Sequence, residues 1–255
     1  MGEKNLLKQD SSIEEKELKP ISGWIALFIG ILFILSPVFG FINLVNTEND
    51  IFLIVTIILF IVAIFIFCGL KIVNPNESIV FVLFGKYYGT IKKPGFFFVN
   101  PFVSAINPTY ESQVTKLSKV GDKDSEQETT TSNTKKISLK AMTLNNQKQK
   151  VNDELGNPII IGTIVIWRVI NPTKAVFNVE NYKTFLSIQC DSTIRNVARL
   201  YPYDSEDTED YSEKSLRGSS QEIADKLKEE LQKRVEIAGI EVEEVRITHL
   251  SYAPE

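Results

Sequence analysis

Residues 21–73 read ISGWIALFIGILFILSPVFGFINLVNTENDIFLIVTIILFIVAIFIFCGLKIV and contain two apolar runs joined by a short polar turn. The first run, residues 21–45, has no charged residue, and the second, residues 51–73, has only Lys71 near its end. A bilayer core about 30 Å thick needs roughly 20 apolar residues of helix, and both runs meet that length. The turn at residues 46–50 is too short to be a domain. The sequence therefore predicts a transmembrane hairpin.

Two other structures could account for the apolar runs. A cleaved signal peptide is disfavoured because the first run is longer than a signal-peptide core and no small-x-small cleavage site follows it. Its leader, residues 1–20, carries four lysines and five acidic residues and so lacks a positive excess. Two core helices of a soluble protein are disfavoured by the length of two adjacent, nearly uncharged stretches. We therefore retain the hairpin and treat residues 1–20 as a polar cytoplasmic tail.

Lysines beside the two runs predict the orientation of the hairpin. The turn at residues 46–50 has no lysine or arginine, whereas basic residues lie at or beyond the outer ends of both runs. These residues are Lys16, Lys19, Lys71, Lys86, Lys92 and Lys93. Because cytoplasmic flanks are enriched in lysine and arginine, both termini and the following domain are predicted to be cytoplasmic. The prediction is a multi-pass protein of the cell membrane.

The composition restricts the partners and the cross-links. The chain has 255 residues and a net charge of −4, which argues against nucleic acid as a partner. About 180 residues follow the hairpin, enough for one domain or two small ones. Cys68 lies in the second run and Cys190 in a predicted helix, so no structural disulfide is expected, as is usual in a reducing cytoplasm.

The segment from residue 74 to residue 255 alternates strand and helix patterns. Runs rich in β-branched and aromatic residues, which predict strands, lie at residues 78–84, 109–118, 137–143, 159–170 and 240–251. Apolar residues at helical spacing, which predict helices, lie at residues 181–200 and 219–238. The polar interval 119–136 is predicted to be a mobile inserted loop. The fold class is α+β, a transmembrane hairpin followed by a mixed α/β domain.

Three local signals predict details of this domain. Asn171 followed by Pro172 predicts a helix N-cap and the first helical position. Ser219 and Glu222 have the spacing of a capping box. In the last strand the apolar alternation changes phase, which predicts a β-bulge near residues 243–244.

An aromatic run follows the hairpin closely in sequence and is the candidate membrane-contact site. It contains Phe96, Phe97 and Phe98, directly after Lys92 and Lys93. The aromatic rings would meet the headgroup region beside the span, and the lysines would meet anionic lipid. The alternative is that the three rings pack in the core of the domain.

The sequence contains no recognisable catalytic or metal motif. His249 is the only histidine, and Cys190 is the best nucleophile that could pair with it, but no local pattern joins the two. The acidic stretch at residues 204–210 lacks the glycine and spacing of a calcium loop, so a solvated loop is favoured. We therefore expect no enzyme activity, no catalytic residue, no cofactor and no metal.

Four segments, taken in order, resemble a known family. They are VNPNESIVFVLFGKYYGTIKKPGFFFVNPF (residues 73–102), ISLKAMTLNNQKQKVNDELGNPIIIGTIVIWRV (137–169), ARLYPYDS (198–205) and GIEVEEVRITHLSYAPE (239–255). As an ordered set they resemble a bacterial member of the SPFH or band 7 superfamily, the stomatin, prohibitin and flotillin relatives. The resemblance covers the chain from about residue 20 to its end.

The resemblance implies a mixed α/β domain of two subdomains close to the membrane. Such proteins continue into a long helix that assembles subunits into rings or cages. They organise lipid and protein microdomains, associate with membrane proteases or transporters, and are not enzymes. Two departures from the family stand out: the interval 119–136 resembles an insertion, and the chain stops at residues 253–255, where relatives begin the assembly helix. We expect either a shortened protein or a partial chain.

The expected function is that of a membrane-anchored scaffold that forms homo-oligomers and organises membrane lipid or partner membrane proteins. The alternative is a regulatory subunit of one membrane protease or transporter.

Overall fold

The computed structural model describes residues 14–47, 50–109, 135–204 and 215–253. Several sequence predictions therefore lie wholly or largely outside the described residues. They concern the tail at 1–20 apart from its last seven residues, the strand at 109–118 apart from Thr109, the loop at 119–136 apart from Lys135 and Lys136, and the acidic stretch at 204–210 apart from Asp204.

The chain divides into two compact units. The first, which we call the hairpin unit, consists of residues Lys16–Ile106 and Lys135–Ile137. The second, which we call the C-terminal unit, has Ser138–Glu255 as its main part. Both units mix helices and strands, so the fold is α+β, as the sequence predicts.

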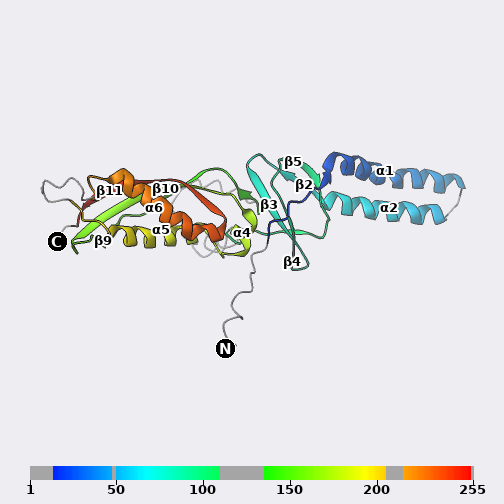
Figure 1. Cartoon of the computed structure of the whole chain (residues 1–255). Coiled ribbons are helices and arrows are strands. Elements are labelled where there is room, and N and C mark those ends of the chain that lie inside the picture. The colour runs from blue at the N-terminus through cyan, green and yellow to red at the C-terminus, as the bar shows by residue number, and fades with distance from the viewer. Residues whose placement is uncertain (1–13, 48–49, 110–134, 205–214, 254–255) are drawn as a thin grey trace, which may run out of the picture. The chain divides into compact units, whose positions relative to one another are not determined.

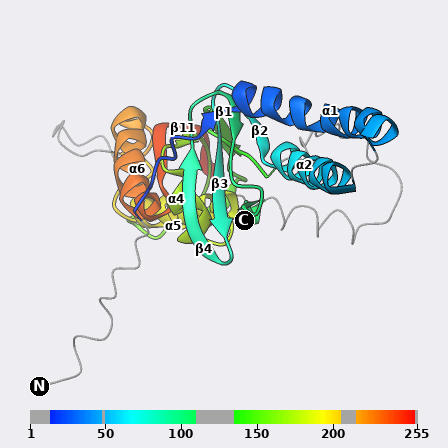
Figure 2. The same ribbon diagram turned by 90° about the vertical axis from the view of Figure 1, so that its right-hand side faces the viewer.

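The hairpin unit begins with two long helices and a small sheet. Helix α1 is Gly23–Thr47 and helix α2 is Asp50–Cys68, and the two lie side by side in both views (Figure 1 and Figure 2). Strand β1 (Ile21–Ser22) precedes α1, and strand β2 (Leu70–Val73) follows α2. Both strands pair antiparallel with β5 (Gly95–Phe98), which lies between them. The two helices therefore start and finish on one sheet.

The second apolar run does not remain helical to residue 73, and the predicted end of the helix is wrong. Helix α2 ends at Cys68, and Gly69 opens the turn into β2. A side chain at Gly69 would place its Cβ 2.4 Å from the carbonyl oxygen of Val99 and 2.5 Å from the ring of Phe98. The close approach lets the Val99 amide donate to the Gly69 carbonyl at 2.9 Å. The last four residues of the run form β2, which pairs with β5.

A second sheet completes the hairpin unit. Its order is β4 (Lys86–Ile91), β3 (Glu77–Leu83) and β6 (Ser104–Ala105), with β7 (Ile137–Ser138) also paired to β3. The apolar core of these strands is formed by buried side chains from several elements: Val73, Ile79, Phe81, Ile91, Val99 and Val103.

The C-terminal unit is built on a third sheet, which is antiparallel. Its order is β11 (Ile240–Tyr252), β10 (Pro158–Val169) and β8 (Met142–Asn145), and β9 (Gln149–Asn152) pairs with the other end of β10. The predicted strand at 137–143 is divided between β7 and β8, which belong to different sheets. It is wrong as a single strand, because the chain passes from one unit to the other there.

The C-terminal unit also contains helices, some of which pack against this sheet. They are α4 (Pro172–Phe177), α5 (Tyr182–Ala198), α6 (Ser220–Val235) and the 3₁₀ turn η1 (Glu236–Ala238). Helix α6 contacts β11 and α5, and α5 also contacts β9 (Figure 1). The interface of α6 is a stripe of buried apolar side chains at helical spacing: Ile223, Leu227, Leu231 and Val235.

Two of the three local predictions are confirmed and one is wrong. The Asn171 side chain accepts a hydrogen bond from the Lys174 amide at 3.0 Å and caps α4. A register shift between β10 and β11 skips Glu243, which is the predicted bulge. Ser219 lies at the N-cap of α6, but its side chain makes no capping hydrogen bond. Its backbone ψ of 34° lies outside the extended range usual at an N-cap.

Candidate membrane-contact site

Small side chains form the contact between α1 and α2. Ala26 and Gly30 are buried on α1, and Thr56 and Ala63 are buried on α2. A Cβ at Gly30 would lie 2.9 Å from the ring of Phe67. Small residues at such a contact allow two helix backbones to approach closely. Gly30 on α1 thus leaves room for the half-buried Phe67 ring of α2.

A serine hydroxyl replaces the backbone donor that proline removes from α1. Pro37 lies within α1 and has no amide hydrogen, so the carbonyl of Phe33 one turn earlier loses its usual donor. The Ser36 hydroxyl donates to that carbonyl at 2.7 Å and lies 3.4 Å from the carbonyl oxygen of Thr56 on α2. A hydroxyl that replaces a missing backbone donor allows proline within a helix in an apolar medium.

The outer faces of both helices carry large apolar side chains. Each of the following is at least 40% exposed: Trp24, Ile25, Phe28, Ile29, Ile31, Leu32, Ile34, Leu35, Val38, Ile51, Ile54, Val55, Ile57, Ile58, Phe60, Ile61, Val62, Ile64 and Phe65. Among the described residues, none of the helices combines the length and the apolar character needed to cross a membrane. The predicted hairpin is present as two packed helices, and its passage through a membrane stays a prediction.

The predicted aromatic run forms β5 and supports the first turn of α1. Phe96, Phe97 and Phe98 are each half-buried. The Phe96 ring meets the Trp24 ring edge-on, with centroids 5.6 Å apart. A Cβ at Gly23 would lie 2.7 Å from Phe96, so glycine is required where the helix leaves the sheet. Phe96 therefore fixes the entry into the hairpin.

Phe97 packs on the buried core, and Phe98 packs where the chain leaves α2. Phe97 packs against the buried cluster of the β3 sheet. Phe98 is opposite Ile21 in β1 and Leu70 in β2, and its ring closes over Gly69. Both packing and lipid contact remain compatible with half-burial, so contact of these rings with lipid stays a prediction.

The two predicted lysines lie at the turn that leads into β5. Lys92 is half-buried, and Lys93 is exposed directly before Pro94. Lys71 lies opposite Phe97 in the pairing of β2 with β5. Two lysines therefore precede the aromatic run and a third lies on the strand paired with it, and their contact with anionic lipid stays a prediction.

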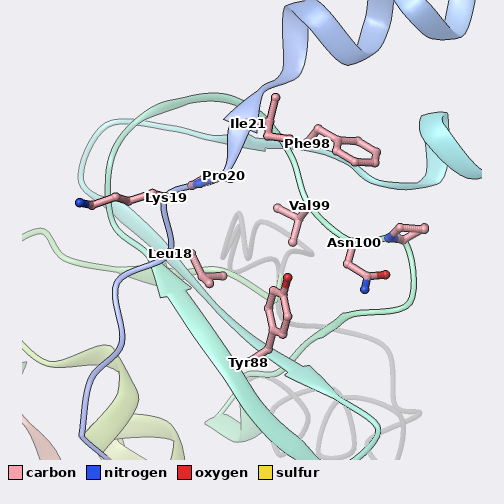
Figure 3. Close-up of a pocket in the computed structure, with 9 residues that line it drawn as sticks. Leu18, Lys19, Pro20, Ile21, Tyr88, Phe98, Val99 and Asn100 are labelled. Carbon is pink, nitrogen blue, oxygen red and sulfur yellow. The ribbon is translucent and has the colours of Figure 1, made fainter.

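A pocket of about 520 Å³ opens beside the start of α1 (Figure 3). It is lined by Leu18, Lys19, Pro20, Ile21, Tyr88, Phe98, Val99, Asn100 and Pro101. In Figure 3 the Tyr88 hydroxyl points toward Val99, while the Lys19 side chain points away from these residues. Its walls are mostly apolar, with one phenol and one amide, which suits a ligand that is itself largely apolar.

The segment that forms one wall of this pocket is held along β4. The Leu18 amide donates to the Thr90 carbonyl at 3.0 Å, and the Thr90 amide donates to the Lys16 carbonyl at 2.9 Å. A Cβ at Gly89 would lie 2.5 Å from the Leu18 side chain. The end of the predicted polar tail is thus part of the sheet and leads directly into the hairpin.

Two exposed aromatic residues, Phe84 and Phe102, lie outside the predicted site. The sequence places Phe84 at the end of a strand, but β3 ends at Leu83 and Phe84 belongs to the following turn. The exposed fractions of Phe84 and Phe102 are 85% and 59%. The available signal in the sequence is that each aromatic lies beside turn residues, Gly85 in one case and Pro101 in the other.

Cys190 and His249, the two residues considered as a nucleophile and its base, differ in burial and in their hydrogen-bond partners. Cys190 is buried, with its sulfur 3.5 Å from Nδ2 of Asn146 and 3.7 Å from the Thr163 hydroxyl. Burial is the main cause that raises the pKa of the Cys190 thiol to about 11. His249 is half-buried, and its Nε2 lies 3.1 Å from the Ser251 hydroxyl. A protonated buried thiol is a packing group and a poor nucleophile.

The acidic and histidine side chains do not gather into a metal site in the described part of the chain. Within the ranges that the structure describes, no group of three histidine, cysteine, aspartate or glutamate side chains is arranged to hold a metal ion. Asp153, a buried carboxylate, is instead used internally. It accepts hydrogen bonds from the amides of Asn157 and Tyr203 at 2.7 and 3.1 Å.

Comparison with known proteins agrees with this architecture. The family model described as "SPFH domain / Band 7 family" matches residues 71–255, which is most of the chain. A stomatin homologue of Pyrococcus abyssi (strain GE5 / Orsay) is 28% identical over 146 residues, which cover 57% of this chain. The match spans 44% of the length of that relative. The matched region contains every strand from β3 onward and helices α4 to α6. The chain therefore belongs to the SPFH domain / Band 7 family.

Proposed function

We propose that this protein is a membrane-anchored scaffold, held in a lipid bilayer by the α1–α2 hairpin. The observation that supports an apolar medium is the distribution of side chains on the hairpin, with small and hydroxyl-bearing residues inside and large apolar residues outside. Burying one large apolar side chain out of water is worth roughly 1.5–3 kcal/mol. Many such side chains would forgo this gain in water, whereas a lipid medium removes the penalty.

We further propose that both ends of the hairpin face the cytoplasm. The lysines at its base, including the exposed Lys19 and Lys93, support this orientation by the enrichment of basic residues on the cytoplasmic side. Trp24 lies in the first turn of α1 and is 63% exposed. Tryptophan is favoured at the level of the headgroups, so Trp24 suits the boundary of the bilayer.

Family membership supports the scaffold part of the proposal. Members of the SPFH family are generally membrane scaffolds and not enzymes. We propose that several copies of the chain associate on the cytoplasmic face and confine lipids and partner membrane proteins. A membrane protease or a transporter is the class of partner that such a scaffold would hold.

The test is the mass of the complex that the full chain forms when it is extracted from membranes in a mild detergent. A large, uniform particle with substoichiometric, lipid-dependent partners is the result expected of a scaffold. A small particle with one stoichiometric partner would instead favour the regulatory subunit of a membrane protease or transporter. A monomer without any partner would contradict both functions.

A further inference from the structure

The turn between β3 and β4 exposes a phenylalanine in a strained conformation. Phe84 has a φ of 47°, a left-handed conformation that is unfavourable for a bulky side chain, and glycine follows it at position 85. Its side chain is 85% exposed, the highest value among the exposed large hydrophobic residues that the structure describes. The ring therefore gains little from folding of its own domain. Strained backbone conformations cluster at functional sites, and exposed apolar side chains mark an interaction surface where several of them adjoin.

Phe84 is part of a row of three rings that leads to the hairpin. Its ring is stacked near that of Phe102, with centroids 6.5 Å apart and planes 28° apart. The Phe102 ring lies 5.9 Å from that of Phe65. The turn that carries Phe102 is fixed, because the Phe102 amide donates to Oδ1 of Asn100 at 3.0 Å. The row thus joins two turns of the sheet region to the end of α2.

The position of Phe65 on α2 sets the level of the three rings relative to a bilayer around the hairpin. Phe65 lies in the last turn of α2, three residues before the helix ends at Cys68, and belongs to its outer apolar face. Phe102 touches it from the side of the strands, and Phe84 continues the row outward. If α2 lies in lipid, the two exposed rings lie at the boundary between the hydrocarbon and the headgroups. Lys86, two residues after Phe84, is exposed and can meet lipid phosphate.

We propose that Phe84 and Phe102 form an aromatic wedge that enters the headgroup region of the phospholipid bilayer at the base of the hairpin. This inference rests on the proposed membrane anchor and adds a contact made by the strand region itself. Aromatic rings are favoured at this level of a membrane. Two contacts, a spanning hairpin and a lateral wedge, hold the strand region against the bilayer. The half-buried run Phe96–Phe98 then acts mainly as the internal support of the hairpin.

The test uses tryptophan as a probe of lipid contact in the full chain reconstituted in phosphatidylcholine–phosphatidylglycerol vesicles. Phe84→Trp is combined with Trp24→Phe, which leaves the buried Trp167 as a constant background. Vesicles with brominated acyl chains should quench the new tryptophan, and its emission should shift to the blue. Phe102→Trp in the same background is a second probe in case the strained position 84 tolerates the larger ring poorly. Leu155→Trp is the matched control, because Leu155 is 68% exposed in a turn of the C-terminal unit.

Each outcome of the experiment is decisive. Quenching at positions 84 and 102, with none at 155, supports the wedge. Blue-shifted emission without quenching by brominated lipid would mean that a protein surface, such as a second copy, covers the rings, and would overturn the proposal. Water-like, unquenched emission at both positions would also overturn it. The native Trp24, measured in the unmodified chain, reports on the hairpin alone and separates failure of the wedge from failure of the membrane anchor.

Discussion

Helices α1 and α2 differ from α6 in which side chains they bury. On α6 the buried stripe contains large residues such as Leu227 and Leu231, and the outer face carries ion pairs such as Lys233 with Glu229 at 2.8 Å. On α1 and α2 the fully buried positions, among the side chains that the structure describes, are small, and many large residues are exposed. Large apolar side chains are thus buried on α6 and exposed on α1 and α2. The outer face of α6 is typical of a helix in water, and the large exposed side chains of the hairpin support the apolar surrounding proposed above.

The difference also separates two sources of stability. In α6 the free energy comes from removing large apolar side chains from water, about 25 cal/mol per Å² of buried apolar surface. Among the described side chains of the hairpin, the fully buried ones are small, so each removes little apolar surface from water. The close approach of α1 and α2 must then rely on van der Waals contact and on hydrogen bonds such as that of Ser36. Substitutions at large residues should therefore act differently in the two places.

The largest effect is expected for Leu231→Ala in α6. Leu231 is 1% exposed, and the cavity that alanine leaves should lower the unfolding free energy of the C-terminal unit by about 2–5 kcal/mol. The matched control is Leu32→Ala in α1, which is 68% exposed and should leave this unit unchanged. Denaturant unfolding followed by the fluorescence of the buried Trp167 measures both. Equal losses of unfolding free energy in the two variants would contradict the difference in burial between α6 and α1.

A charge on the outer face of α2 should disturb membrane insertion. Ile58 is 54% exposed near the middle of α2. Ile58→Lys should disfavour insertion of the helix by about 2.5–3.5 kcal/mol, measured as the fraction of chain that is integrated into membranes. Ile188→Lys is the control, because Ile188 is 58% exposed on α5 in the C-terminal unit. Integration that is unaffected by Ile58→Lys would argue that this face meets no lipid.

The two cysteines should differ in their effect on alkaline stability. Burial raises the pKa of Cys190 from 9.0 to about 11, so its contribution is present below pH 9 and is lost as the pH rises through 11. The unfolding free energy of the C-terminal unit should fall by on the order of 2–3 kcal/mol over that interval. Cys190→Ala should remove the part of this fall that begins at pH 9, whereas Cys68→Ala at the exposed end of α2 should retain it.

Tyrosine titration gives an internal reference for the same experiment. Burial raises the pKa of Tyr182 from 10.0 to about 12. Ionisation of Tyr182 should therefore lower the unfolding free energy of the C-terminal unit above pH 10 in both cysteine variants. A slope between pH 9 and pH 10 that persists in Cys190→Ala would show that another group is responsible.

The smallest effect is expected for the ion pair between Lys136 and Glu77 in the hairpin unit. Lys136 Nζ lies 3.0 Å from Glu77. Desolvation alone would raise the pKa of Glu77, but hydrogen bonds from Lys136 and Asn74 lower it below its usual value. This contribution is present above about pH 4.5 and is lost as the pH falls. Lys136→Met should lower stability by less than about 1 kcal/mol at neutral pH. The difference from the unmodified chain should vanish in acid.

Much of the fold could be predicted because its signals are local. The β-branched run that forms β10, the asparagine cap of α4 and the phase change at Glu243 each depend on neighbouring residues. The division of residues 137–143 could not be predicted, because it depends on pairing with β3 and β10, which are remote in sequence. The end of α2 at Cys68 is set in the same way, by the approach of Val99 and Phe98 to Gly69.

The candidate site was only partly accessible from the sequence. A cluster of three phenylalanines at 96–98 is conspicuous in a sequence, and it does lie at the base of the hairpin. Whether a ring is half-buried or exposed depends on which strands flank it, and β5 happens to be the central strand of its sheet. Phe84 and Phe102 are isolated in the sequence and meet only in the fold. Isolated aromatic residues in turns are therefore worth examining beside any apolar hairpin.

Extraction of membranes with alkaline carbonate, followed by flotation of the full chain with lipid, tests directly whether α1 and α2 are embedded in a bilayer. The side-chain distribution on α1 and α2 predicts that the chain stays with the lipid fraction after extraction. Ile58→Lys should shift part of it to the soluble fraction, and Ile188→Lys should not. Release of the unmodified chain into the soluble fraction would contradict a hairpin embedded in lipid, and with it the membrane-anchored scaffold.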